Sequence, residues 1–473
     1  MFRMKYLNPD SPDPNLIRRG QHFLIVASCM AVITGTSTGG VFATTVALKM
    51  DASPLYIGVL QAAHLGSWAL MLLTIQKIQR NGKKLLLVYG HAISLLFLVP
   101  LPFIPDLWHR FGDTRPSIPL MVFFLSLMGR HFFKGIAQTG WMPMIQDNVP
   151  LNQRGRFFGR MRTGWQSVLV VFMIVLGVFV GEDAPWHVIR LIYVCAIVGA
   201  AGHVLCLLPV REFPPSGEVM PVFDLITRPF RDRQFRWVLL YMFTYSSAIG
   251  LADQFRFVYL KKLGFDYSLL MYGSATVFLG GVLTLRLWGR LADRFGGRAM
   301  FSICHVGVIA SILGWLFVSP GRAGCAWALV LLATMGIFNS GQGLAITRHL
   351  FGIIDRRQQA SYITMSSIVG MATIGLAAFV GGAFLNAAEG TEIRMGSVTV
   401  TEYHILFSVS GLLFLLPHFL RRRLRHGTEA PSAEVIAFVT RPLRMMLGNI
   451  FAVVPRTLDS GTDTSEDDQQ ERL

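Results

Sequence analysis

The sequence is poor in charge. Only 15% of its 473 residues are charged, whereas soluble proteins carry about 25%. Hydrophobic residues make up 52%, which excludes an ordinary soluble domain and is typical of a chain that crosses a membrane many times. The net charge of +16 could suggest nucleic acid. The basic residues, however, lie in short connections between apolar runs, which is the placement that sets membrane orientation. We therefore expect a lipid bilayer, and no nucleic acid, as partner.

Cysteine is scarce, and the sequence signatures of enzymes are missing. The five cysteines all lie in apolar runs, without metal or redox spacing. The chain has no Gly-x-Ser-x-Gly, no His-Glu-x-x-His and no phosphate-binding loop. We predict no catalytic residues, no metal site and no cofactor, so the protein is not expected to be an enzyme.

Long apolar runs, in contrast, are abundant. A helix needs about 20 apolar residues to cross a bilayer core of roughly 30 Å, and helices satisfy every backbone polar group within one segment. The sequence predicts an all-α integral membrane protein with twelve spans, at about 23–47, 55–76, 85–104, 118–139, 163–181, 188–208, 237–259, 268–288, 299–318, 325–346, 361–386 and 404–420.

Lysine and arginine are distributed unevenly between these spans. If the N-terminus is cytoplasmic, the inner loops 77–84, 147–162, 289–298 and 347–360 hold fourteen of them, and the central stretch 209–236 holds five. The six outer connections hold seven, beside nine acids. Basic loops stay on the cytoplasmic side. We therefore predict a multi-pass protein of the cell membrane with both termini in the cytoplasm.

The chain also repeats itself with a period near 213 residues. Thr227-Arg228-Pro229 follows the sixth span and Thr440-Arg441-Pro442 follows the twelfth, and three further matches share nearly the same offset. This pattern predicts two parallel, pseudo-symmetric six-helix halves. We divide the chain into a cytoplasmic N-terminus (1–22), a first half (23–208), a cytoplasmic linker with an amphipathic segment (209–236), a second half (237–420) and a cytoplasmic tail (421–473). Within the tail, 433–451 is expected to lie on the membrane and the acidic end to be disordered.

A charged, glycine-rich stretch joins the eighth and ninth spans. It reads Gly289-Arg290-Leu291-Ala292-Asp293-Arg294-Phe295-Gly296-Gly297-Arg298, and its position between two apolar runs predicts a short turn. The pattern Gly-x-Leu-Ala-Asp-Arg-x-Gly-x-Arg resembles the loop motif of the major facilitator superfamily of secondary transporters. The resemblance implies the twelve-helix fold of that family and transport by alternating access.

The resemblance also implies a conformational role for this motif. Its candidate residues are Gly289, Asp293, Arg294, Gly296 and Arg298, with Arg80 and Gly82 from the matching first-half turn. In the family, the acid meets the inner end of a helix from the opposite half, where the positive dipole end stabilises a carboxylate. In the first half Gln79 replaces the acid, so we expect the latch at Asp293 to matter more.

Polar residues inside the spans are the candidates for a substrate cavity, because ionisable groups in a membrane usually face a cavity or a partner. Spans 1, 4, 7 and 10 line the cavity in the family that the chain resembles. The candidates on these spans are Thr36, Thr38, Arg130, Lys134, Gln138, Tyr245, Asp253, Asn339 and Gln342. A wall with Arg130 and Lys134 would favour an anionic or hydrogen-bonding substrate.

Structural roles remain open for the same residues. Arg130 could bond carbonyls of a neighbouring helix, Lys134 could extend toward the inner surface, and Asp253 could pair with Arg256 or Lys261. The Thr, Ser and Gly residues of span 1 could serve close helix packing. Four intramembrane histidines could relay protons, although a lone histidine more often bonds a neighbour: His64, His131, His203 and His305.

The sequence therefore predicts a monomeric secondary transporter of a small solute, with an anion as one possibility and a co-transported ion as a further partner. Without an ATP site, transport would use a gradient or be passive. The alternatives are a passive facilitator, a proton-driven exporter, and, from another class, a transporter-like receptor or interaction protein.

Overall fold

The computed structural model describes Tyr6 and residues 13–150, 153–214, 221–295, 297–353, 359–395 and 398–424. Nearly all of these residues are helical, as expected where lipid offers no partner to backbone polar groups. The predicted surface helix at 433–451 and the acidic end fall outside the described residues.

The first half contains the six predicted spans, several of them divided into shorter helices. The first span divides at Gly39 and Gly40, where Gly40 has a φ of +56° that favours glycine. The elements are α1 (Pro14–Thr38), α2 (Gly40–Lys49), α3 (Pro54–Gly66), η1 (Ser67–Leu70), α4 (Met71–Asn81), α5 (Lys83–Leu96), η2 (Leu101–Phe103), α6 (Ile104–Phe111), α7 (Ser117–Gln138), α8 (Trp141–Asn148), α9 (Arg154–Val180) and α10 (Trp186–Leu207).

The second half follows a short helix in the linker, α11 (Val222–Arg231). Its first span also divides, at Asp253 and Gln254. The elements are α12 (Arg233–Ala252), α13 (Phe255–Lys262), α14 (Tyr267–Phe295), α15 (Gly297–Gly314), η4 (Trp315–Phe317), α16 (Arg322–Ile353), α17 (Gln359–Ala387), β1 (Glu392–Met395), β2 (Val398–Thr401), α18 (Glu402–Leu413), α19 (Leu415–Leu420) and η5 (Arg421–Arg423).

Within the described residues, eleven helical segments are long and apolar enough to cross a membrane. The predicted seventh span is not among them. It corresponds to α12, which ends at Ala252 and carries Tyr241, Thr244, Tyr245 and two serines that lower its hydropathy. By position, α12 and α13 complete the set of twelve. The predicted fold class, a helical membrane protein of this architecture, is confirmed.

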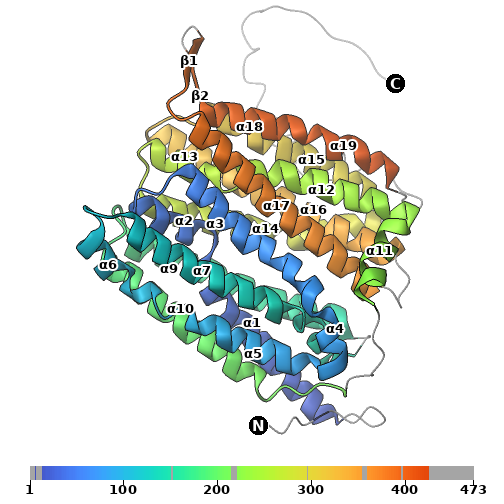
Figure 1. Ribbon diagram of the computed structural model, residues 1–473. Coiled ribbons are helices and arrows are strands. Elements are labelled where there is room, and N and C mark those ends of the chain that lie inside the picture. The colour runs from blue at the N-terminus through green and yellow to red at the C-terminus, as the bar shows by residue number, and fades with distance from the viewer. Residues whose placement is uncertain are drawn as a thin grey trace, which may run out of the picture.

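A small hairpin is the exception to the helical fold. Strands β1 and β2 pair antiparallel, with Glu392 opposite Thr401, and project from one end of the molecule (Figure 1). The run Val398-Thr399-Val400-Thr401 is β-branched throughout, which favours a strand. The sequence predicts only a connection between the spans 361–386 and 404–420, because the segment is short and lies between two strong apolar runs.

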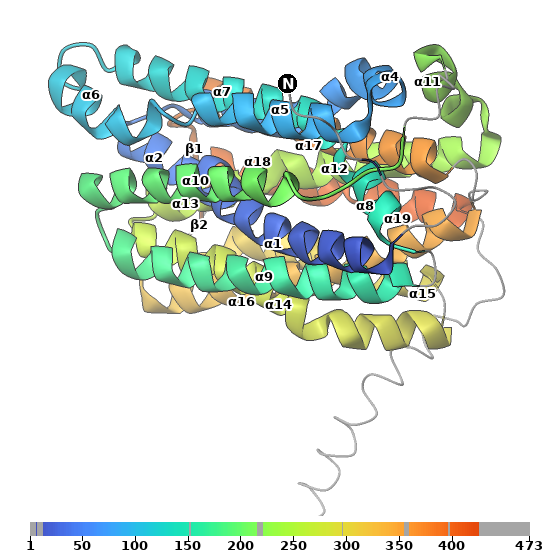
Figure 2. The same cartoon turned by 90° about the horizontal axis from the view of Figure 1, so that it is seen from below.

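The helices of the two halves form two neighbouring groups, coloured blue to green and green to red in Figure 1. The halves meet where α3 packs on α17 and where α9 packs on α14; Figure 2 shows α1, α9 and α14 running side by side. We call the end of the bundle where α1 begins the N-terminal face and the other end the opposite face. At the opposite face α3 and α17 touch through glycine, since a Cβ on Gly382 would lie 2.6 Å from the Pro54 carbonyl oxygen.

Candidate functional site

Helix α7 carries the charged candidates of the first half. Arg130, Lys134 and Gln138 recur every four residues and so share one side of the helix. Arg130 is only 4% exposed, and its Nη1 donates a 3.1 Å hydrogen bond to Ser94 Oγ of α5. Lys134 and Gln138 are half-buried. This side of α7 therefore faces the protein interior and presents two cations there.

No carboxylate forms an ion pair with either cation in the part of the chain that the structure describes. The four ion pairs found there join other residues, and Nε of Arg130 is buried without a hydrogen-bond partner. An unpaired charge inside a membrane protein is costly. An anion or a strong hydrogen-bond acceptor bound beside Arg130 and Lys134 would lower that cost.

The polar candidates of the second half bond one another. Tyr245 Oη donates to Asn339 Oδ1 over 2.8 Å, linking α12 to α16. Gln342 bonds the hydroxyl of Tyr241, which also lies 2.8 Å from Nε2 of His305. Tyr245 and Asn339 are half-buried, whereas Gln342 is buried. The first pair can therefore face a solute, while the second set forms an interior network.

Two candidates on spans 1 and 7 have structural partners. The Thr38 hydroxyl donates to the Thr34 carbonyl at 2.8 Å, and Thr36 is buried, which favours the packing interpretation for this part of α1. Asp253 forms an ion pair with Arg256, whose guanidinium lies 5.9 Å from the centre of the Trp315 ring. The ion pair that sequence analysis left open is thus present.

Gln254, next to Asp253, joins the two halves inside the bundle, on the side of the opposite face, at the level of the break in the first span. Its Nε2 donates to the Gly40 carbonyl at 3.2 Å and also bonds the Thr44 hydroxyl, while its Oε1 accepts a 2.6 Å hydrogen bond from Gln61. In the described residues, the hydrogen bonds of Arg130, Tyr245 and Gln342 each stay within one half, so no such bond joins the candidates on α7 to those on α12 and α16. No group of three or more His, Cys, Asp or Glu there could hold a metal ion.

The first-half turn at the N-terminal face is shorter than predicted. Of the residues 77–84, only Gly82 lies outside a helix, with a φ of +90°. A Cβ there would lie 2.7 Å from Oε1 of Glu212, so glycine gives that carboxylate access to the turn. Arg80 is exposed.

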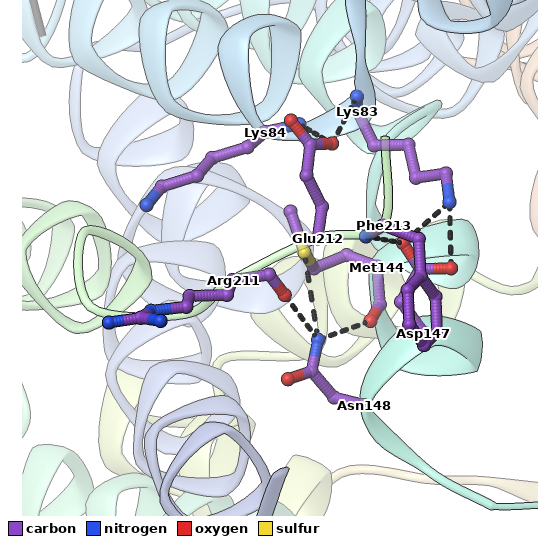
Figure 3. Close-up of polar contacts among 8 residues, drawn as sticks. All are labelled: Lys83, Lys84, Met144, Asp147, Asn148, Arg211, Glu212 and Phe213. Atoms are coloured by element: carbon purple, nitrogen blue, oxygen red, sulfur yellow. Dashed lines mark hydrogen bonds and ion pairs between the residues drawn. The ribbon is translucent and has the colours of Figure 1, made fainter. Parts of the chain in front are cut away.

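Glu212 caps the helix that begins at this turn (Figure 3). Its Oε2 accepts hydrogen bonds from the backbone N–H groups of Lys83 at 2.6 Å and Lys84 at 2.9 Å, which suits an anion at the start of α5. Burial raises the pKa of the Glu212 carboxyl, and the two N–H groups act in the opposite direction. Because the pKa of Glu212 is higher in the folded than in the unfolded protein, the group stabilises the folded state most at pH values below its pKa in the unfolded protein. This stabilisation is lost as the pH rises through the pKa of Glu212 in the folded protein.

A second carboxylate completes the cluster. Asp147 of α8 accepts from Lys83 Nζ at 2.7 and 2.5 Å and from the Phe213 N–H at 3.0 Å. The cluster therefore fastens α5, α8 and the chain after α10 together. Glu212 is not among the predicted site residues, because the connection 209–236 holds three further acids and nothing local in the sequence distinguishes Glu212 from them.

Asp147→Asn should lower the free energy of unfolding by about 1–3 kcal/mol, because it removes a charged hydrogen-bond acceptor that is mostly buried. Thermal unfolding of the purified protein in detergent measures this as a lower Tm. The matched control is Asp106→Asn, because Asp106 pairs with Arg190 while both side chains are about half exposed, and such pairs contribute about 0–1 kcal/mol. Equal shifts for the two variants would contradict a structural role for the cluster.

The second-half motif is also more helical than the predicted turn. Gly289, Asp293 and Arg294 belong to the last turns of α14, and Arg298 belongs to the first turn of α15. Gly296, between the helices, lies outside the described residues, as do the side chains of Asp293, Arg294 and Arg298. The short turn is confirmed in position but not in length, since helical backbone continues into it from both sides.

Comparison with known proteins identifies the chain. Residues 24–382 match the family model of the Major Facilitator Superfamily. The multi-drug resistance efflux pump PmrA homolog of Lactococcus lactis is 22% identical over 358 residues, 72% of this chain and 80% of the relative. The probable nitrate/nitrite antiporter NarK2 of Thermus thermophilus is 24% identical over 367 residues, 72% of this chain and 77% of the relative.

Solved structures share the fold. The nucleoside transporter NupG, as a D323A mutant, superposes with a TM-score of 0.64 at 12% identity, covering 87% of this chain and 100% of the other. A D-xylose-proton symporter gives a TM-score of 0.62 at 15% identity, covering 86% and 96%. The family match spans most of the chain and includes the motif at Gly289. The protein is a multi-pass membrane transporter, not an enzyme, and it belongs to the Major Facilitator Superfamily.

Proposed function

We propose that the protein is a secondary transporter of a small anionic solute, which it binds at Arg130 and Lys134. The observation that carries this proposal is the pair of cations on one side of α7 without a carboxylate partner in the described residues. A bound anion would supply the missing counter-charge inside the membrane. Tyr245 and Asn339 would add hydrogen bonds from the second half.

The relatives offer limited support for this substrate class. The name of one relative, the probable nitrate/nitrite antiporter, specifies inorganic anions, whereas the name of another specifies drug efflux. The two-cation side of α7 favours the first class over uncharged drugs, because a buried guanidinium offers only hydrogen-bond donors. A neutral, apolar solute would not lower the free-energy cost of the two unpaired cations.

Alternating access is the mechanism that we propose. The Gln254 bonds to Gly40 and Gln61, together with a 2.9 Å bond from the Ser268 N–H to the Gly181 carbonyl, hold the halves together on the side of the opposite face. These bonds must break before that face can open. We propose further that the N-terminal face is cytoplasmic in the cell membrane and that Asp293 acts as the latch there.

Uptake by proteoliposomes tests the substrate class. The probes are nitrate, nitrite, phosphate and acetate, against the uncharged solutes uridine and xylose, each as a radiolabelled or dye-detected compound. We expect uptake of at least one anion above the rate of protein-free liposomes and none of the uncharged solutes. Uptake of an uncharged solute without any anion would overturn the proposal.

A further inference from the structure

The break in the first span exposes backbone groups inside the bundle. Helix α1 ends at Thr38 and α2 begins at Gly40, so carbonyl groups near the break lack their usual helical partners. Gly39 is fully extended there, with φ −150° and ψ −179°. Non-helical backbone at membrane depth is tolerated only where protein or a cavity surrounds it.

Two histidines from different helices lie against this break. His131 of α7 has its Nε2 3.0 Å from the Thr38 carbonyl oxygen. A Cβ on Gly39 would lie 2.3 Å from Nδ1 of His64 of α3, so glycine lets that ring reach the backbone. The centres of the two imidazole rings are 4.2 Å apart. The two histidines are 67 positions apart in the chain, and nothing in the sequence indicates that they meet.

The hydrogen bond to Thr38 fixes the proton position on His131. A carbonyl oxygen can only accept, so Nε2 must carry the hydrogen, and Nδ1 of the neutral ring is then a free acceptor. Nδ1 of His131 and Nδ1 of His64 are both buried without a hydrogen-bond partner among the described residues. The pair thus offers a basic nitrogen to a proton, with a second imidazole beside it.

The charges around the pair are all positive. Arg130 and Lys134 of α7 act electrostatically on both histidines, and His91 of α5 lies within reach of the same two cations. No carboxylate contributes to the electrostatics of His64 or His131 in the described part of the chain. A proton on the pair would add a third positive charge to this region, which is unfavourable while the region holds no anion.

We propose that the His64–His131 pair is the binding site for a coupling proton, and that it is occupied only together with an anion at Arg130 and Lys134. The inference rests on the proposed function, because the anion supplies the charge that permits protonation. The step is an acid–base reaction with hydronium as the donor: one O–H bond of hydronium breaks, an N–H bond forms at Nδ1 of His131, and a neutral water molecule is left. The anion and the proton then cross the membrane together, in the same direction.

A coupled proton would make anion binding depend on pH. If one proton binds with each anion, the anion and the proton strengthen each other's binding by the same factor. Between the pKa of the pair without the anion and its higher pKa with the anion bound, the Kd of the anion should therefore rise about tenfold per pH unit. Without the coupling, the Kd should be nearly constant over the same interval.

Proton uptake by the purified protein in detergent tests the site. The protein is placed in weak buffer with a pH-indicating dye, and nitrate, nitrite, phosphate or acetate is added as its sodium salt at matched pH. Anion binding is followed separately by the increase in Tm. We expect uptake of about one proton per bound anion for the wild type and almost none for His131→Gln, whose amide can still donate to the Thr38 carbonyl.

A second histidine pair provides the matched control. His203 has its Nδ1 2.8 Å from the Ala27 carbonyl oxygen of α1 and its ring 4.4 Å from that of His91. Because His203 bonds through Nδ1, the matching change is His203→Asn, whose amide can still donate to the Ala27 carbonyl; it should keep the proton uptake. His64→Gln gives a second variant at the proposed site and should lose it.

The possible outcomes separate the two proposals. If no anion raises the Tm, the anion site is wrong, and the proton site fails with it. If an anion binds without proton uptake, the anion site stands and the proton site is overturned. Proton uptake that persists in both His131→Gln and His64→Gln would also overturn the proton site, as would an anion Kd that is independent of pH.

Discussion

Arg130→Met is expected to reduce anion transport about 100-fold, since hydrogen bonds to charged groups contribute about 1.5–3 kcal/mol each. Methionine keeps the length and apolar volume of the side chain but removes the charge and the bond to Ser94. The same change should leave the Tm unchanged or raise it, because a buried charge without a carboxylate partner is replaced by an apolar group. Uptake by proteoliposomes and thermal unfolding measure the two effects.

The opposite signs of these effects distinguish a binding role from a structural one. If Arg130 mainly held α7 against α5, Arg130→Met would lower the Tm and reduce transport through loss of folded protein. The control is Arg190→Met, since Arg190 is a half-exposed arginine paired with Asp106; we expect it to transport normally. Normal transport by Arg130→Met would remove the main support for the anion site.

Gly382→Val should prevent closure of the opposite face. A Cβ at Gly382 would meet the Pro54 carbonyl oxygen at 2.6 Å and the Cα of Gly58 at 3.1 Å, and backbone atoms cannot move aside as a flexible side chain can. Helices α3 and α17 belong to different halves, so the added side chain must separate the halves there. We expect transport to fall more than about tenfold, because overpacking of this kind costs typically 1–3 kcal/mol and here acts on one conformation only.

The separation can be measured with spin labels on cysteines at Asp51 and Glu389, two positions near the opposite face in different halves, after replacement of the native cysteines. The mean distance between the labels should increase in Gly382→Val. Gly66→Val is the control on α3, because a Cβ at Gly66 meets nothing within 4 Å. An unchanged distance distribution in Gly382→Val would show that the helices accommodate the side chain without separating.

Hydropathy was sufficient to predict the helical membrane fold, because each span carries its own apolar signal. The signal was weakest for α12, where Tyr241 and Tyr245 replace aliphatic residues and serve contacts to α15 and α16. Those contacts are tertiary and leave no local pattern. The hairpin β1–β2 was missed for a related reason, since its strands have only four residues each.

The sequence predicted which helix carries each residue of the candidate site, but not which residues on other helices it contacts. The spacing of Arg130, Lys134 and Gln138 placed them on one side of α7 correctly. Nothing local could show that Ser94 would be the partner of Arg130, or that His64 and His131 would meet at Gly39. Each of these contacts joins segments whose separation in the chain is set by the packing of whole helices.

The contact between Gln254 and Gly40 joins two residues 214 positions apart, which is nearly the period of the internal repeat. Each is therefore close to the symmetry mate of the other. In a symmetric dimer of identical subunits such a contact would occur twice, once in each direction. Here it occurs once, because Gly40 has no side chain with which to return it. If two copies of the first half faced each other, Gly40 of one copy would lie against Gly40 of the other. Neither Gly40 carbonyl would then receive a hydrogen bond from a glutamine side chain. At this contact the two halves are therefore complementary: the second half supplies the amide donor of Gln254, and the first half supplies the carbonyl acceptor of Gly40.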